Sequence, residues 1–168
     1  LCHCATRPLC LANWLQQEPV MPDQTRLADF LPYLLSITSN VVSDRIADEY
    51  RARFGLKIPE WRVMAVLGDA GPRTQRELVG ATRMDKVAVN RACKVLEDRG
   101  LIERSPNAND GRSHHLELTA AGRGIHGEIM PIALEMERRL FAPLSSAERL
   151  EFKALLARIH NQAAAQGE

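Results

Sequence analysis

The stretch that decides the fold runs from Thr74 to Leu118 and reads TQRELVGATRMDKVAVNRACKVLEDRGLIERSPNANDGRSHHLEL. It predicts a short helix, a turn, a second helix with a basic face, and a β-hairpin with Arg112 at its tip. This order of elements is typical of a winged helix-turn-helix, which binds duplex DNA with a helix and a hairpin arm.

The short helix begins with a capping box, Thr74-Gln75-Arg76-Glu77. In such a box the threonine hydroxyl accepts a hydrogen bond from a free backbone amide, and the glutamate side chain reaches back to the amide of the threonine. The helix is expected to continue through Val79, and residues 80–84 are expected to form the turn that follows.

The second helix is predicted from Asp85 to Arg99, with Gly100 as its stop. Its apolar residues have three-and-four spacing and should face the core. These residues are Val89, Ala92, Cys93 and Leu96. Lys86, Asn90 and Lys94 share the opposite face, with Arg91 at its edge. A face of this kind suits the major groove, where Asn pairs with adenine and Arg or Lys with guanine or phosphate; an ordinary exposed surface is the alternative.

The hairpin is predicted from two short strands, residues 101–104 and 115–118, joined by turn-forming residues 106–111. Arg112 at the tip could enter the minor groove, and Asp110 could pair with it and fix its direction. His114 and His115 should point to opposite faces because neighbours on a strand alternate. Contact with phosphate or solvent is therefore expected of them, rather than a metal site.

Amphipathic helices flank this region. An apolar stripe from Leu27 to Phe54 predicts a long first helix, capped by Asp29 and ended by Gly55, and Pro59 is expected to open a helix that contains Trp61. After the hairpin, Thr119 can cap a helix that Pro131 should kink, and a capping box at residues 145–148 opens the last helix. Both ends are expected to meet a second subunit.

The expected fold is therefore mainly α with a small β-hairpin wing, a winged helix-turn-helix flanked by N- and C-terminal dimerisation helices. Residues 1–25 are expected to be a leader, non-native or disordered, with a natural start at Met21. Residues 26–165 form a single domain, in which 57–118 are the winged helix-turn-helix and 26–55 and 120–165 the dimerisation helices.

Composition is compatible with this fold. The 168 residues carry a net charge of +1, but the segment from Arg73 to His115 holds nine Lys or Arg against six Asp or Glu. A local cationic excess of this kind suits phosphate binding. No apolar run approaches the roughly 18 residues of a spanning helix, so a soluble cytoplasmic protein without membrane contact is expected.

The four cysteines do not suggest a disulfide framework. Cys2, His3, Cys4 and Cys10 crowd the leader, but a closed zinc site needs four ligands in the right geometry, so no metal or other cofactor is expected.

Three other functions can be compared with the sequence. Residues 122–127 read GRGIHG, the dinucleotide-binding fingerprint, but the residues that follow predict helix instead of the second parallel strand that such a site needs. Catalytic motifs such as a nucleophile elbow or a phosphate loop are missing, so an enzyme is not expected. A winged helix that binds only proteins remains the alternative, and it would not need Arg112 or the Lys86/Asn90/Lys94 face.

Several ordered segments resemble the MarR family of bacterial regulators. They are residues 59–67 (PEWRVMAVL), 84–86 (MDK), 89–92 (VNRA), 96–102 (LEDRGLI), 110–113 (DGRS) and 118–122 (LTAAG). The resemblance covers about Leu27 to Ile159. It implies a homodimer that binds a pseudo-palindromic operator in double-stranded DNA, usually as a repressor that a small molecule releases.

The resemblance also implies site residues. The DNA-binding set is Thr74, Gln75, Asp85, Lys86, Asn90, Arg91, Lys94, Asp110, Arg112, Ser113 and His114. Asn90 stands where the family commonly has Ser or Thr, which could alter base preference, and Gly111 replaces a frequent arginine of the wing.

An effector pocket between the long first helix, the Trp61 helix and the helix after the wing is implied as well. Its expected lining is Ser36, Asn40, Arg45, Tyr50, Trp61 and Arg62, and the DGRSHH segment is similar to regulators of aromatic-acid catabolism, so an aromatic acid or aromatic acyl-CoA is the expected effector. The alternative, redox control through cysteine, is disfavoured because the first helix has none and Cys93 should be buried.

Overall fold

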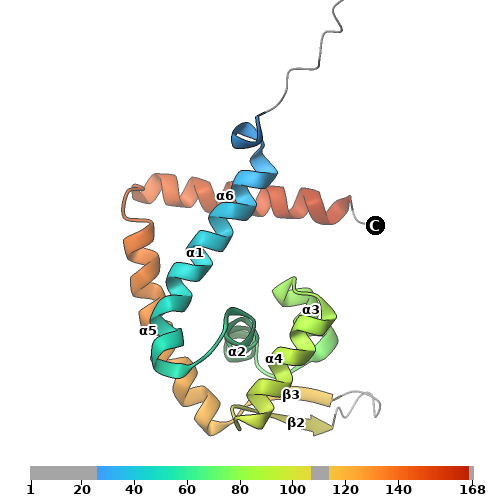
Figure 1. The fold of residues 1–168 in the computed structure, drawn as a ribbon. Coiled ribbons are helices and arrows are strands. Elements are labelled where there is room, and N and C mark those ends of the chain that lie inside the picture. The colour runs from blue at the N-terminus through green and yellow to red at the C-terminus, as the bar shows by residue number, and fades with distance from the viewer. Residues whose placement is uncertain (1–25, 107–113, 167–168) are drawn as a thin grey trace, which may run out of the picture. The chain divides into compact units, whose positions relative to one another are not determined.

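The structure, a computed structural model, describes residues 26–106 and 114–166 (Figure 1). The chain divides into two compact units between Thr38 and Ser39, a boundary that falls inside the first long helix, α1 (Leu31–Phe54). The two units are described separately.

The first unit contains a 3₁₀ turn, η2 (Leu27–Asp29), and the N-terminal part of α1. The expectation that Asp29 caps the long first helix is wrong, because Asp29 belongs to this turn and α1 begins two residues later, at Leu31. Six large apolar side chains of this unit are exposed, whereas Leu34 is half-buried. They are Leu27, Phe30, Leu31, Tyr33, Leu35 and Ile37.

In the second unit, α1 ends where expected, because Gly55 adopts a left-handed backbone with φ of 63°. Helix α2 (Ile58–Ala70) follows and begins one residue earlier than expected, so Pro59 is its second residue. The amide of Lys57 donates to Oε2 of Glu60 at 2.8 Å, which satisfies one of the free donors at the start of α2.

Helix α3 (Gln75–Thr82) has the predicted capping box: the Thr74 amide donates to Glu77 Oε2 at 2.7 Å, and the Glu77 amide donates to Thr74 Oγ1 at 3.3 Å. The expected end at Val79 is wrong. A single glycine costs a helix only about 1 kcal/mol, so Gly80 does not stop it. The helix ends instead at Thr82, and the next residue, Arg83, has a left-handed backbone with φ of 54°.

Helix α4 (Lys86–Asp98) and the hairpin follow. Gly100, with φ of 66°, stops α4 as expected. The hairpin consists of β2 (Ile102–Pro106) and β3 (His114–Leu118), which pair antiparallel from Ile102↔Leu118 to Pro106↔His114. Pro106, expected in the turn, belongs to the edge strand β2, where a residue without an N–H is tolerated.

A third strand, β1 (Arg73–Thr74), was not expected. It pairs with β3 on the side away from β2, so the sheet order is β1-β3-β2. Thr74 therefore both pairs in the sheet and caps α3.

Two helices complete the unit, α5 (Ala120–Leu140) and α6 (Ser146–Ala165). The Thr119 hydroxyl accepts from the Gly122 amide at 3.1 Å, and Ser145 with Glu148 forms the predicted capping box of α6. Helix α5 continues without a break through Pro131, and α6 buries none of its residues.

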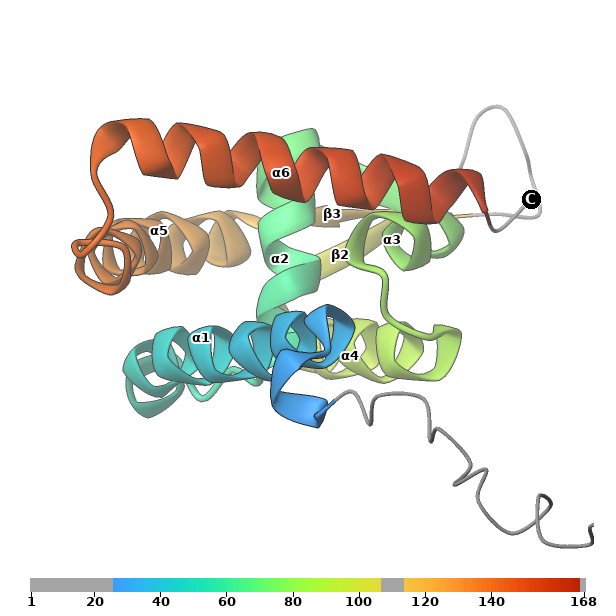
Figure 2. The ribbon, with the colours of Figure 1, turned by 90° about the horizontal axis from the view of Figure 1, so that it is seen from above.

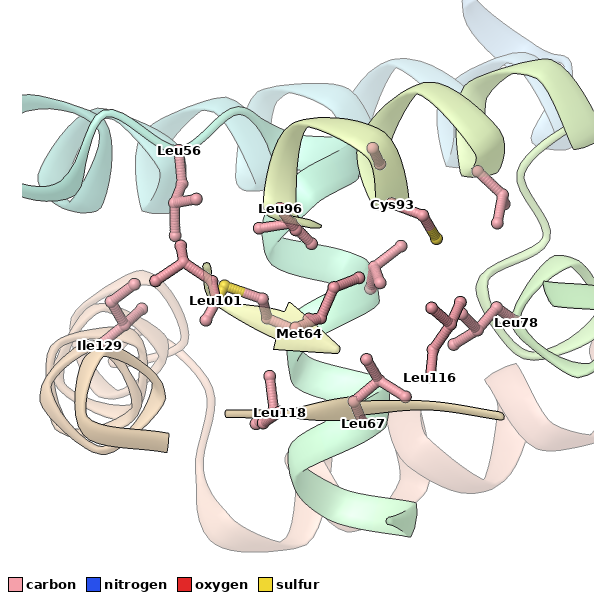
Figure 3. Close-up of a cluster of buried hydrophobic side chains, with 14 of the residues drawn as sticks. Leu56, Met64, Leu67, Leu78, Cys93, Leu96, Leu101, Leu116, Leu118 and Ile129 are labelled. Atoms are coloured by element: carbon pink, nitrogen blue, oxygen red, sulfur yellow. The ribbon is translucent and has the colours of Figure 1, made fainter. Parts of the chain in front are cut away.

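The core surrounds α2, which packs against α3, α4, α5 and the sheet (Figure 2). Figure 3 shows Met64 and Leu67 of α2 meeting side chains from α3, α4, the hairpin and α5. The core side chains predicted on α4 are all buried, Cys93 among them. The fold is mainly α with a small antiparallel sheet, as expected, and no helix among the described residues is long and apolar enough to cross a membrane.

Candidate nucleic-acid interface

The polar face predicted on α4 is exposed in the structure. Lys86, Asn90, Arg91 and Lys94 all reach solvent, while Val89, Ala92, Cys93 and Leu96 on the other side of the helix are buried. The packing of that apolar side against α2 and α3 holds the cationic face outward on a rigid element.

Three of the residues expected to bind DNA take structural roles at helix starts. Asp85 caps α4, because its Oδ1 accepts from the Ala88 amide at 2.8 Å. Thr74 caps α3, and its bonds to Glu77 lower the pKa of that carboxyl group. Gln75, the first residue of α3, is half-buried, and its side chain lies beside the Cys93 thiol.

Two cations near the interface are already engaged within the chain. The Arg99 guanidinium donates to the carbonyl of Phe54 at 2.6 Å and to that of Gly55 at 3.3 Å, so it satisfies free acceptors at the end of α1. Arg104 of β2 forms a two-point ion pair with Glu97 of α4, in which Nη2 lies 3.0 Å from Oε2. This pair connects the hairpin to the last turn of α4.

Lys86, Arg91 and Lys94, by contrast, have no ion-pair partner within residues 26–106 and 114–166. Arg76 on α3 and Arg83 at its end are also exposed without such a partner in these ranges, and neither was expected to bind DNA. The sequence signal that could have identified them is their position next to the turn between α3 and α4. These five exposed cations thus lie together on α3, on α4 and in the turn between them.

The tip of the wing lies outside the described residues, and with it Asp110, Arg112 and Ser113. His114, the first residue of β3, is exposed, and His115 is half-buried, as alternation along a strand predicts. The base of the hairpin is fixed by its pairing with β1 and by the Glu97–Arg104 ion pair.

Cys93 is fully buried, and burial raises the pKa of its thiol. Because the thiolate is the reactive form of cysteine, a buried thiol with a raised pKa reacts slowly with oxidants. This location does not favour redox control through Cys93.

The polar residues expected to bind an effector are exposed or half-buried. Ser36 is exposed in the first unit. In the second unit, Asn40 is exposed, Arg45 is exposed and lies 3.9 Å from Asp48, and Nη2 of Arg62 donates to Ser43 Oγ at 3.4 Å.

Tyr50 and Trp61 belong to a row of three rings from α1, α2 and α5. The centroids of Tyr50 and Trp61 are 5.7 Å apart, and those of Trp61 and His126 are 5.6 Å apart, with the latter two rings stacked at 28°. Burial raises the pKa of Tyr50 to about 12 and lowers the pKa of His126. His126 was not expected in this site, since a contact between residues so far apart in the sequence leaves no local pattern.

Two hollows occur elsewhere in the second unit. One of about 220 Å³ lies where α2 meets the sheet and the start of α5, and another of about 460 Å³ runs along one side of α6. None of the six residues expected to bind an effector lines either hollow.

The glycines that mimic a dinucleotide fingerprint have a packing explanation. A Cβ on Gly122 would lie 1.9 Å from the carbonyl oxygen of Leu101, whereas Gly124 and Gly127 face open space. Gly122 therefore allows the start of α5 to approach the α4–β2 connection, and no phosphate is needed to account for it.

Comparison with known proteins agrees with this geometry. The family model described as MarR family matches residues 54–113. A crystal structure of a probable transcriptional regulator from Pseudomonas aeruginosa is 33% identical, with a TM-score of 0.70, and the match covers 80% of this chain and 99% of that one. The chain belongs to the MarR family.

Two further relatives agree with this assignment. The HTH-type transcriptional repressor Rv2887 of Mycobacterium tuberculosis is 27% identical over 135 residues, which cover 79% of this chain and 96% of the relative. Bordetella bronchiseptica BpsR, whose DNA binding is regulated by 6-hydroxynicotinic acid, is 25% identical, with a TM-score of 0.69 and coverage of 77% and 98%. This MarR-family chain is thus a transcriptional regulator and not an enzyme.

Proposed function

We propose that this regulator is a homodimeric repressor that binds a pseudo-palindromic operator and is released by a small aromatic acid or its CoA thioester. In this proposal residues 57–118 are the winged helix-turn-helix, and residues 26–55 and 120–165 supply the dimer interface. The observation that carries the proposal is the exposed cationic face of α4, with Lys86, Arg91 and Lys94 beside Asn90.

The DNA-binding step uses α4 in the major groove. Asn90 and Arg91 would contact base edges, while Lys86, Lys94, Arg76 and Arg83 would contact phosphates, because Asn suits adenine and Arg suits guanine. Arg112 and His114 of the wing would reach the neighbouring backbone and minor groove, assisted by Asp110 and Ser113. Thr74, Gln75 and Asp85 would act by holding α3 and α4 in place.

The dimer would bury the apolar side chains that α6 leaves exposed. Leu150 is 72% exposed and Ile159 is 53% exposed, on a 20-residue helix without a single buried residue. A second copy of the chain would cover this surface, since contiguous exposed apolar patches commonly mark protein interfaces. Symmetry would then set two α4 helices against major grooves roughly 34 Å apart.

The effector would bind in the second unit near Tyr50 and Trp61, with Asn40, Arg45 and Arg62 as the polar lining. Ring faces favour an aromatic ligand, and a guanidinium binds a carboxylate at two points. The regulation of BpsR by an aromatic acid supports this ligand class. The effector would bind more tightly to a form of the dimer in which the two α4 helices do not match the spacing of the major grooves. Operator binding would then weaken by the difference between the effector's affinities for this form and for the DNA-binding form.

Two alternatives receive less support. Redox control through Cys93 conflicts with the burial of its thiol. A winged helix that binds only proteins would not need unpaired cations across α3 and α4, so neutralising them would leave its binding unchanged.

The test measures binding of the full chain to duplex fragments from the region upstream of its own gene, by fluorescence anisotropy. Specific binding that weakens as aromatic carboxylates are titrated would support the proposal. Binding that no aromatic acid or aromatic acyl-CoA changes at saturation would refute ligand release, and failure to prefer any fragment over random duplex would refute operator recognition.

The dimer is tested separately by analytical ultracentrifugation. Leu155→Asp and Ile159→Asp would each place a charge on the apolar side of α6 and are expected to give monomers. Lys153→Asp, an exposed change on the same helix, is the matched control and should leave a dimer. A monomeric wild-type chain at micromolar concentration would refute the assembly.

A further inference from the structure

The cationic face of α4 contains one apolar side chain. Val87 is 57% exposed, more than Val95, the other exposed valine of α4, which is 38% exposed. At about 100° of rotation per residue, Val87 lies almost opposite the buried stripe centred on Val89, Ala92 and Leu96. It therefore points directly outward.

Val87 shares this outward side with the polar residues expected to contact DNA. Asn90 and Arg91 follow it by three and four residues, and Lys94 by seven, so all three lie on adjoining turns of the same helix side. The valine thus stands among the side chains that would enter the groove.

Nothing within α4 accounts for a valine here. β-branched residues are poorer helix formers than alanine or lysine, and the cap of the helix is made by Asp85 with the Ala88 amide, without Val87. The side chain also gains little from burial in the free protein, since more than half of its surface is exposed. A contact made only in the complex would account for it.

We propose that Val87 is a specificity-determining residue that recognises the methyl group of a thymine in each operator half-site. This inference rests on the proposed function. The thymine methyl is the apolar group that base pairs present in the major groove, and residues near the N-terminus of a recognition helix contact base edges. Val87, the second residue of α4, occupies such a place.

The shape of valine suits this contact. Its branched Cβ restricts χ1 largely to one rotamer in a helix, so little conformational freedom is lost when the methyl groups meet. With Asn90 and Arg91 beside it, the half-site should contain thymine close to an adenine or guanine, because these are the bases that Asn and Arg bind at two points.

The experiment compares duplexes that differ by one methyl group. The full-length wild-type chain is first used to enrich a duplex from a random pool. Each thymine of the enriched half-site is then replaced in turn by deoxyuridine, which lacks only the methyl group. At one thymine, this replacement should lower wild-type affinity about fourfold per half-site, the value of one buried methyl-sized group.

Val87→Ala should bind the thymine and deoxyuridine duplexes equally at that thymine, and Val87→Thr, which keeps one methyl group, should retain part of the discrimination. Val95→Ala is the matched control, because Val95 is also an exposed valine of α4, at 38%, but lies about two turns further from the N-terminus of the helix. It should discriminate as the wild type does. Circular dichroism and thermal midpoints verify that each variant is folded.

The outcomes separate this inference from the proposed function. A wild-type chain that binds an enriched duplex but ignores every deoxyuridine replacement overturns the role of Val87 and leaves operator binding intact. Equal discrimination by Val87→Ala and wild type overturns it as well. If no duplex is enriched, the proposed DNA binding fails, and the inference fails with it.

Discussion

Replacing Gly122 by alanine should destabilise the protein, although alanine is the better helix former. A Cβ at this place would lie 1.9 Å from the Leu101 carbonyl oxygen and 3.0 Å from its carbonyl carbon. Both atoms belong to the backbone, so no side-chain rotation relieves the clash. The same oxygen accepts the Thr119 amide at 3.1 Å, and that hydrogen bond joins α5 to the α4–β2 connection.

Three contributions determine how much Gly122→Ala changes the free energy of unfolding. Forcing a methyl group into a packed contact costs about 1–3 kcal/mol. Weakening the Thr119–Leu101 hydrogen bond adds about 0.5–1.5 kcal/mol. The better helix propensity of alanine offsets about 1 kcal/mol. Gly122→Ala should therefore lower the free energy of unfolding by about 0.5–3.5 kcal/mol, the sum of these contributions.

Gly124→Ala is the matched control, since Gly124 lies two residues further along α5 and a Cβ added there would meet nothing within 4 Å. It should stabilise the protein by up to about 1 kcal/mol. Urea unfolding followed by circular dichroism measures both variants, and their thermal midpoints should differ by about 1–18 °C. If Gly122→Ala is as stable as Gly124→Ala, the close approach at Leu101 does not constrain the fold.

Three other perturbations test local features of the site. Thr74→Ala removes the hydroxyl that caps α3 and should lower the free energy of unfolding by about 1 kcal/mol in urea titrations; an unchanged midpoint would contradict the capping role. Glu97→Gln breaks the partly exposed pair with Arg104 and should cost at most about 1 kcal/mol, with the loss shrinking as salt is added; a loss independent of salt would argue against an ionic contribution. Burial lowers the pKa of His126, so its neutral form favours the fold, and this stabilisation should be lost as the pH falls below the usual histidine value of about 6.5. The thermal midpoint of His126→Gln should therefore fall less steeply than that of the wild type between about pH 7 and pH 5, and parallel curves would exclude the effect.

Features determined by neighbouring residues were predictable from the sequence. The capping boxes at Thr74 and Ser145 and the buried stripe of α4 depend on spacings of three or four residues, and all are present in the structure. The stop signals Gly55 and Gly100 also act locally, through their left-handed backbone. Local patterns therefore identified the main helices, the hairpin and the exposed face of α4.

Features that depend on distant partners were not predictable. Strand β1 has two residues, too few to show alternation, and forms only because β3 offers an edge. The stacking of His126 on Trp61 and the capping of α1 by Arg99 join residues far apart in the chain. Arg83, not a glycine, adopts the left-handed backbone that follows α3, and no local pattern indicated this.

The central claim, that the exposed cations of α4 bind DNA, is tested most directly by the salt dependence of operator affinity for the wild type and Lys86→Ala. Each phosphate contact contributes about 0.9 to the slope of log affinity against log salt. Lys86→Ala in a dimer should therefore bind more weakly and lose about 1.8 from the slope, while sedimenting as the wild type does. An unchanged affinity and slope would contradict the claim.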